Sequence, residues 1–181
     1  TAVLRRRILA TLVPVWFGTK LRVARAYDYR WNASARGFEM RCELIRGRHV
    51  ALHHPYTSPD ACEMRDAVHC VMKPLQARLA EAGFDGLVWQ AGKGNPVALN
   101  NFMCEASDDD GGRRWVWIDL ESGVPALVPI NPVDLFLFYL PKSVQHGRPL
   151  FDDVDVPKLR DYVRNHREEL NDKLSREDVE E

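Results

Sequence analysis

The chain has 181 residues, 45% of them hydrophobic, which is enough for one sizeable core. Its 25 lysines and arginines nearly balance 26 aspartates and glutamates, and the net charge of −1 gives no overall attraction for nucleic acid or for a charged membrane. Four scattered cysteines, no apolar run of roughly 20 residues and no signal-peptide layout exclude a disulfide-rich secreted domain and a membrane span, so we expect reduced thiols and a cytoplasmic location.

The first 48 residues predict a short helix and two strands. Residues 5–12 are expected to form a basic helix with Arg5, Arg6 and Arg7 toward solvent, which Pro14 ends. Alternating apolar and polar residues predict strands over 20–29 and 38–45. The chain begins with Thr and not with Met, which we interpret as a processed or truncated protein.

A long helix is predicted from Ser58 to Gly83. Ser58 suits the N-cap, and apolar residues then recur every three or four positions until Gly83. Pro74 cannot donate a backbone hydrogen bond, so we expect a kink or a break there. Residues 86–89 predict a short apolar strand, and residues 91–96 a loop.

An Asp-Gly step at Asp110 predicts a β-hairpin, in which residues 101–105 pair antiparallel with residues 115–120. The midpoint between Asn100 and Asp119 falls inside the turn. The two oxygen-bearing side chains should therefore meet at the open end of the hairpin. Such a pair suits Mg²⁺, which one or two protein groups hold together with phosphate and water.

The last third predicts an extended segment over 124–132, a buried helix over 134–140 and an amphipathic helix over 156–174. Trp115 and Trp117 share a strand face and are predicted to be core residues and not a stacking platform for nucleic acid. A zinc site is an alternative use of the histidines and cysteines between 53 and 70. However, His69 and Cys70 are adjacent on a helix and point about 100° apart, and no C-x-x-C spacing exists.

The order of these elements resembles the larger lobe of the protein-kinase-like fold. In that family a long helix leads to a catalytic loop that closes with Asn, and a hairpin carries this Asn to the Asp of a metal-binding turn. The segment 93–100 (KGNPVALN) matches the loop in length, and residues 117–121 (WIDLE) resemble the turn. Only about 14 residues separate Asp119 from Asp134, which makes lipopolysaccharide and other small-molecule kinases the nearer relatives.

This resemblance implies an α+β fold with two parts. Residues 49–181 would form a kinase-like large lobe, mostly helical with a catalytic-loop hairpin, and residues 1–48 a reduced or truncated small β lobe that ends in the hinge. Asn100 and Asp119 would hold Mg²⁺ on the phosphates of ATP, and Asn95 would occupy the catalytic position. Three residues are assigned to nucleotide binding, namely Glu43 and Ile45 in the hinge and Lys93 in the loop. Asp134 resembles the Asp that braces the catalytic loop.

Two departures from the family pattern bear on activity. The catalytic Asp is replaced by Asn95, whose amide cannot accept the proton of an attacking hydroxyl, and Lys93 stands where His is usual. A Gly-rich phosphate loop, the strand Lys and its partner Glu are not recognisable before residue 40. We therefore expect a kinase-like relative of small-molecule or lipopolysaccharide phosphotransferases that is inactive or incomplete as this chain, a pseudokinase.

The competing interpretation is a non-catalytic kinase-like module that binds or scaffolds a partner. A metal-dependent hydrolase is a weaker third interpretation, because it needs further inward-facing carboxylates. The expected partners are a nucleotide and a small-molecule or lipid-linked substrate, with no nucleic acid and no transmembrane segment. A missing small lobe would expose apolar surface, which predicts self-association.

Overall fold

The computed structural model describes residues 2–50, 60–95, 98–106, 112–120, 131–147 and 154–173, and these form a mixed α+β structure. The α-helices are α1 (Ala2–Phe17), α2 (Asp60–Asp66), α3 (Lys73–Glu81), α4 (Pro132–Asp134), α5 (Leu140–His146), α6 (Val156–Asn165) and α7 (Arg167–Lys173). The strands are β1 (Leu21–Val23), β2 (Ala26–Asn32), β3 (Gly37–Cys42), β4 (Arg48–His49), β5 (Phe102–Ala106) and β6 (Arg113–Trp117). Within the described ranges, no helix is both long and apolar enough to cross a membrane.

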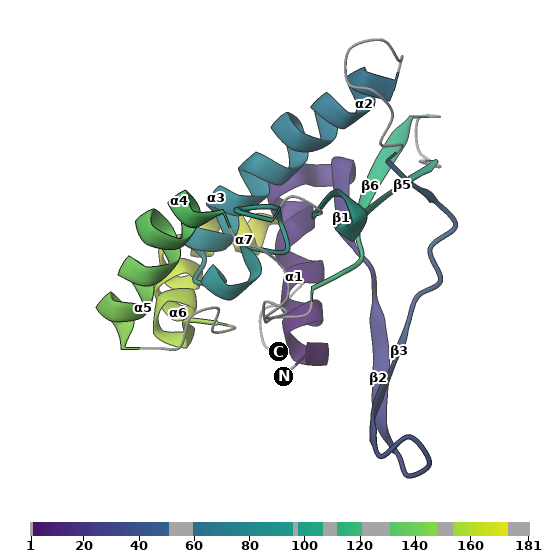
Figure 1. Cartoon of the computed structure of the whole chain (residues 1–181), viewed down its shortest axis with the longest axis horizontal. Helices are drawn as coiled ribbons and strands as arrows, with labels where there is room; N and C mark the ends of the chain where they lie inside the picture. Colours follow the sequence, from purple (N-terminus) through teal and green to yellow (C-terminus); the bar gives the residue numbers. More distant parts are fainter. Residues whose placement is uncertain are drawn as a thin grey trace.

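Two small sheets form the β part of the molecule. The larger sheet has the order β1-β6-β5-β4, in which β1 runs parallel to β6 and the other neighbours are antiparallel. The second sheet is the hairpin of β2 and β3, which projects away from the helices (Figure 1). The predicted strand over 20–29 is therefore two strands in different sheets, separated at residues 24–25. The predicted strand over 38–45 is β3, which ends at Cys42.

One hydrophobic core joins α1, the larger sheet, the long helix and α6. Leu9 and Val13 of α1, Leu75 of α3 and Trp117 of β6 are fully buried in it. The core thus contains side chains from both parts of the chain that the sequence divides at residue 48. That division stays a prediction.

Helix α1 differs from the predicted basic helix in length and orientation. It continues through Pro14, because Leu9, Leu12 and Val15 bury apolar side chains on both sides of the proline. The prediction that all three arginines face solvent is wrong: Arg5 and Arg6 are 3% and 5% exposed, whereas Leu4 is 58% exposed. Arg6 is buried because its Nη2 donates to the carbonyl of Ile118 at 2.9 Å, directly after β6.

The predicted long helix is present from Asp60, and its Ser58 cap lies outside the described residues. Between α2 and α3 the chain makes a π-helical segment, η2 (Ala67–Met72), directly before Pro74. A π-bulge is a usual way for a helix to absorb a residue that cannot follow the α-helical hydrogen-bond pattern. The helix ends after Glu81, and Gly83 follows in the left-handed conformation with φ of +86°.

The predicted strand at residues 86–89 is wrong. Residues Asp85–Leu87 form a 3₁₀ turn, η3, and Val88 and Trp89 continue in turns. All of them are buried against the helices, and the backbone closes local bonds such as that from the Ala91 N–H to the Leu87 carbonyl at 3.1 Å. A short apolar run fits a buried turn as well as a strand, so the pattern alone could not separate the two.

The predicted helix at 134–140 is confirmed as a helix but not as buried. It consists of α4, the π-helical segment η5 (Leu135–Tyr139) and α5. Phe136 and Leu137 are 64% and 77% exposed, and only Tyr139 of this segment lies in the interior. The extended segment predicted before it lies largely outside the described residues.

The predicted C-terminal helix is confirmed, with a break at His166 that separates α6 from α7. Tyr162 and Leu170 are buried as expected, whereas Val163 is partly exposed. The start of helix α6 lies beside the end of α3, because the Asp155 N–H donates to the Gly83 carbonyl at 2.7 Å. The Asp155 side chain caps α6 by accepting a hydrogen bond from the Lys158 N–H at 3.1 Å.

Gly83 and Gly147 allow a matched test of this junction. Both follow a helix with positive φ, +86° and +60°, but a Cβ at Gly83 would lie 2.8 Å from the Asp155 carbonyl oxygen, whereas nothing lies within 4 Å at Gly147. We expect Gly147→Ala to lower the free energy of unfolding by about 1 kcal/mol and Gly83→Ala by at least about 2 kcal/mol. Chemical denaturation of both variants checks this, and equal losses would contradict the close packing at Gly83.

Candidate functional site

The predicted hairpin between β5 and β6 is confirmed, and its turn lies outside the described residues. Phe102 pairs with Trp117 in the register, and the Ile118 N–H donates to the Asn101 carbonyl at 2.9 Å, one position further toward the open end. Asn100 and Asp119 come next along the two chain segments, outside the paired strands. Asn100 closes a 3₁₀ turn, η4 (Ala98–Asn101), together with Asn101 and is exposed, and Asp119 is half-buried.

Asn101, and not Asn100, is the asparagine that braces this end of the hairpin. Its Nδ2 is buried and donates to the backbone carbonyl of Gln90 at 2.9 Å and to the Gln90 Oε1 at 2.8 Å. The turn before β5 is thereby attached to residue 90, at the start of the loop. The sequence pattern did not predict this role. The adjacent pair of asparagines was the available signal, because consecutive residues of a 3₁₀ turn point about 120° apart, so only one of the two faces the interior.

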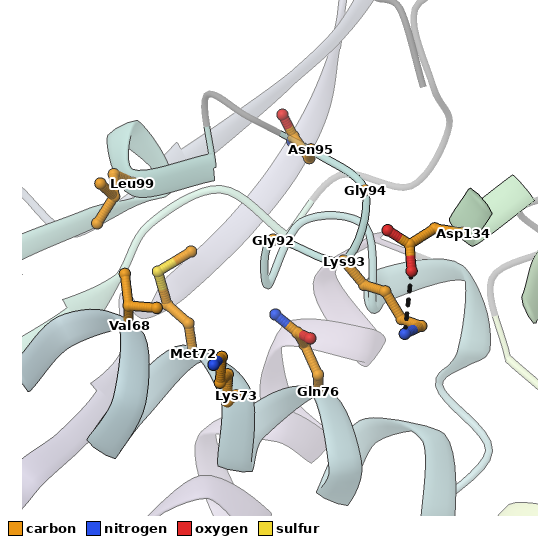
Figure 2. A pocket seen from close by; sticks show the side chains of 10 residues that line it. All are labelled: Val68, Met72, Lys73, Gln76, Gly92, Lys93, Gly94, Asn95, Leu99 and Asp134. Atoms are coloured by element: carbon orange, nitrogen blue, oxygen red, sulfur yellow. Dashed lines mark ion pairs between the residues drawn. The ribbon is translucent and has the colours of Figure 1, made fainter. Parts of the chain in front are cut away.

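A pocket of about 300 Å³ lies between the long helix and the loop at residues 92–95 (Figure 2). Its helix side is formed by η2 and the first turn of α3. On its loop side, Lys93 lies between Gly92 and Gly94, and Asn95 follows Gly94. The lining residues are Val68, Met72, Lys73, Gln76, Gly92, Lys93, Gly94, Asn95, Leu99 and Asp134. Two predicted site residues, Lys93 and Asn95, are therefore brought to one pocket.

The loop beside the pocket is held from three directions. The Gln76 Nε2 of α3 donates to the Ala91 carbonyl at 2.9 Å, and the Tyr139 hydroxyl donates to the Lys93 carbonyl at 2.9 Å. Burial raises the pKa of the Tyr139 phenol well above its ordinary value, so the donor stays protonated. The Lys93 Nζ lies 3.2 Å from the Asp134 Oδ1 and over the ring of Phe138 at 4.9 Å.

Asp134 occupies the position that the sequence resemblance assigned to a brace of the loop. Besides pairing with Lys93, its side chain packs beside Gly94, where a Cβ would lie 3.2 Å from the Asp134 Cβ. The neighbouring Asn131 N–H donates to the Gly94 carbonyl at 3.3 Å. Lys93 is thus oriented toward Asp134 at one side of the pocket (Figure 2).

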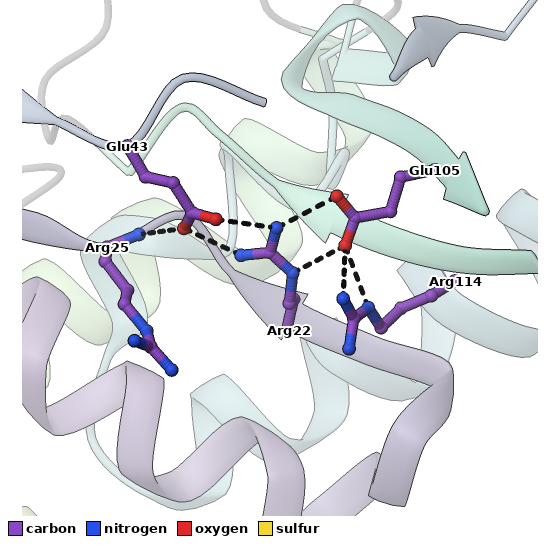
Figure 3. A network of polar contacts seen from close by, with 5 residues as sticks. All are labelled: Arg22, Arg25, Glu43, Glu105 and Arg114. Atoms are coloured by element: carbon purple, nitrogen blue, oxygen red, sulfur yellow. Dashed lines mark hydrogen bonds and ion pairs between the residues drawn. The ribbon is translucent and has the colours of Figure 1, made fainter. Parts of the chain in front are cut away.

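The predicted hinge residues lie elsewhere, beside β1. Glu43 follows β3, and its carboxylate accepts hydrogen bonds from both terminal nitrogens of Arg22 at 2.8 and 2.9 Å (Figure 3). The same guanidinium donates from Nε and Nη2 to Glu105 of β5 at 2.7 and 2.9 Å, and Arg114 of β6 adds a bond of 2.8 Å. The Glu43 N–H donates to the Arg25 carbonyl at 2.9 Å. Glu43 and Ile45 are not among the residues that line the pocket.

The charged groups of this network shift one another's pKa values. Hydrogen bonding from Arg22 holds the pKa of Glu105 below its ordinary value. Partial burial would raise the pKa of Glu43, but the hydrogen bonds from Arg22 and the Arg25 N–H outweigh it, and the net direction is also downward. The pKa of Arg22 is raised, chiefly by its bond to Glu105. All three groups are therefore charged at neutral pH.

The described residues contain no group of three or more His, Cys, Asp or Glu side chains that could hold a metal ion. Cys62, His69 and Cys70 are exposed, and His53 and His54 lie outside the described residues. Magnesium needs fewer protein ligands than zinc, because phosphate and water complete its shell. The amide oxygen of Asn100 and the carboxylate of Asp119 are hard oxygen donors of the type that it prefers.

The chain was compared with family models, curated proteins and solved structures. No protein-family model, curated protein or solved structure matches the chain.

Replacing Arg22 by Met should destabilise the fold by about 2–3 kcal/mol at pH 7, because two partly buried carboxylates would then lose the cation between them, with Arg114 still paired to Glu105 alone. In the wild type, the pKa values of Glu43 and Glu105 are lowered on folding. Their contribution to the free energy of unfolding is therefore fully present above the unfolded-state pKa of roughly 4.3 and is lost as the pH falls through the lower folded-state values. In Arg22→Met the pair repels, so acidification from pH 7 to 5 should stabilise the variant. Denaturation at both pH values checks this, and a variant whose stability relative to the wild type is no greater at pH 5 than at pH 7 would contradict it.

Asn101→Asp should cost about 2 kcal/mol at pH 7, because a carboxylate cannot donate to the two oxygens of Gln90 that Asn101 now serves. Asn100→Asp, at the neighbouring exposed position, should change stability by no more than about 0.5 kcal/mol. Thermal and chemical unfolding of the two variants measures the difference. Similar losses in both would show that the two asparagines do not divide into a bracing and a solvent-facing residue.

Proposed function

We propose that this chain is a kinase-like protein that binds ATP with Mg²⁺ at the open end of the β5–β6 hairpin. The observation that supports the proposal most is the register, in which Phe102 pairs with Trp117 and the bond from the Ile118 N–H to the Asn101 carbonyl continues the pairing. Two residues with oxygen-bearing side chains, Asn100 and Asp119, come next along the two chain segments at this end of the hairpin. A hairpin that joins such residues is the arrangement that the resemblance to protein-kinase-like proteins requires.

The order of the described elements supports the same reading. The hairpin β2–β3 is followed by a connector, the helix from α2 to α3, the loop at 91–95, the hairpin β5–β6 and the helix from α4 to α5. Asp134 opens this last helix and pairs with Lys93 of the loop. In the proposal, residues 43–48 contact the adenine through backbone groups and Ile45, whereas the Glu43 side chain serves the Arg22 network.

Bound Mg²⁺ would neutralise charge on the transferred phosphoryl group and bridge it to the protein. The Asp119 carboxylate and the Asn100 amide oxygen would hold it, and the bond from Arg6 to the Ile118 carbonyl would fix the turn that carries Asp119. Asn95 lines the pocket but its amide cannot take a proton from an attacking hydroxyl. The Lys93 ammonium is engaged by Asp134. We therefore propose binding with slow or no phosphoryl transfer.

The second candidate is a non-catalytic binding module, which the exposed aromatic face of the β2–β3 hairpin favours. Tyr29, Trp31 and Phe38 lie together on this face, with ring centroids of Phe38 6.1 Å from Tyr29 and 5.1 Å from Trp31, and all three are largely exposed. The opposite face carries the ion pairs of Asp28 with Arg41 and of Arg30 with Glu39. Exposed apolar surface of this kind marks contact sites. Self-association through the surface that a missing small lobe would expose stays a separate prediction.

Calorimetric titration of ATP with and without Mg²⁺ separates the two candidates. We expect ATP to bind in a Mg²⁺-dependent manner and Asp119→Asn to weaken that binding at least about tenfold, because a neutral amide holds the cation less well. Asp172→Asn, an exposed position on α7, is the matched control and should bind like the wild type. Absence of nucleotide binding in the folded wild type would favour the non-catalytic module, and equal affinity in Asp119→Asn would remove Asp119 from the site.

A further inference from the structure

The pocket beside the loop contains a cation that the proposed nucleotide site does not use. Lys73, in the first turn of α3, lines the pocket and is exposed. Its ammonium makes no ion pair or hydrogen bond with another described residue. The other two charged groups of the lining, Lys93 and Asp134, neutralise each other at 3.2 Å. The lining therefore has a net charge of +1, carried by Lys73.

An apolar strip lies next to this cation. Val68 and Met72 are four residues apart on the long helix, and Leu99 of η4 faces them across the pocket (Figure 2). The Met72 side chain reaches the loop only because residue 92 is glycine, where a Cβ would lie 2.6 Å from the Met72 Cε. Met72 is already buried, whereas Val68 and Leu99 are partly exposed, so an apolar ligand group along this strip would chiefly remove Val68 and Leu99 from water.

The loop side adds polar groups at the far edge of the pocket. Gly94 has φ of +77°, and its N–H makes no hydrogen bond within the described part of the chain. Asn95 is also a lining residue, with its side chain directed away from the helix (Figure 2). Backbone N–H groups in glycine turns and a lysine ammonium are both donors that suit anionic oxygens.

From these features we infer that the pocket is a second binding site, for a small molecule with an anionic oxygen head group and a short aliphatic body. Lys73 binds the head group, and Val68, Met72 and Leu99 contact the body. The volume of about 300 Å³ lies at the lower end of the range for small-molecule sites, which limits the ligand to a short chain. Asn100 and Asp119, which would hold Mg²⁺, do not line this pocket, whereas Lys93 and Asn95 do, so the pocket adjoins the proposed nucleotide site without containing its metal ligands.

Hexyl phosphate titrated into the ¹⁵N-labelled full chain, without nucleotide or metal, tests the site by amide NMR and calorimetry. We expect saturable binding, with the largest shifts at residues 72–76 and 92–95. Hexanol, which lacks the charge, and inorganic phosphate, which lacks the aliphatic body, should each bind at least about tenfold more weakly. Hexanoate distinguishes the head group: binding like hexyl phosphate identifies a general anion site, and weaker binding a phosphate site.

Lys73→Gln should weaken hexyl phosphate binding about tenfold, whereas Lys73→Arg, which keeps the charge, should retain it within a few-fold. Lys20→Gln is the matched control, because Lys20 pairs with Asp66 away from the pocket, and it should bind like the wild type. Equal affinity in Lys73→Gln and wild type, shifts centred elsewhere, or inorganic phosphate binding as tightly as hexyl phosphate would overturn the inference. Failure of the chain to bind Mg²⁺ and ATP would leave it unaffected.

Discussion

The pairing of β5 with β6 is the constraint on which the rest of the structure depends. These two strands form the centre of the larger sheet, with β1 added on one side and β4 on the other. At their open end Phe102 and Trp117 are directly opposed, buried and stacked, with ring centroids 6.1 Å apart and planes 8° from parallel. A slip of one residue would turn both rings toward the opposite face, so the core itself fixes which residues follow at the end of the hairpin.

Buried charge then attaches the surrounding elements to this hairpin. Arg22 of β1 joins Glu105 of β5 to Glu43 after β3, so one guanidinium holds the sheet to the base of the projecting β2–β3 hairpin. Arg6 makes a corresponding attachment at the other end of β6, where α1 bonds the Ile118 carbonyl. An arginine serves both positions well because its planar head offers several donors in fixed directions. Apolar packing alone would not specify these directions.

Sequence patterns predicted the elements whose signals are local. The turn at Asp110 with alternating strands predicted the β5–β6 hairpin, and the apolar periodicity predicted the helices at 60–81 and 156–173. The patterns failed where tertiary contacts decide. A run of arginines on α1 reads as a solvent face unless an acceptor is known to lie beside it, and the apolar residues 86–89 fit any buried conformation. The exposure of Leu137 has no local signal either, because its sequence neighbourhood is that of a core helix.

The candidate site shows the same limit at the scale of single residues. Spacing predicted that residues 100 and 119 oppose each other, but not that the neighbouring Asn101 would take the bracing role, since that depends on Gln90. Nor did spacing reveal the pocket, whose walls come from residues 68–76, 92–95, 99 and 134. The bond from Asn101 to Gln90 joins the hairpin to the start of the loop, and Leu99 of the same 3₁₀ turn lines the pocket. The attachment of this turn therefore sets the positions of Asn100 and of Leu99 in the pocket wall together, because both residues belong to η4.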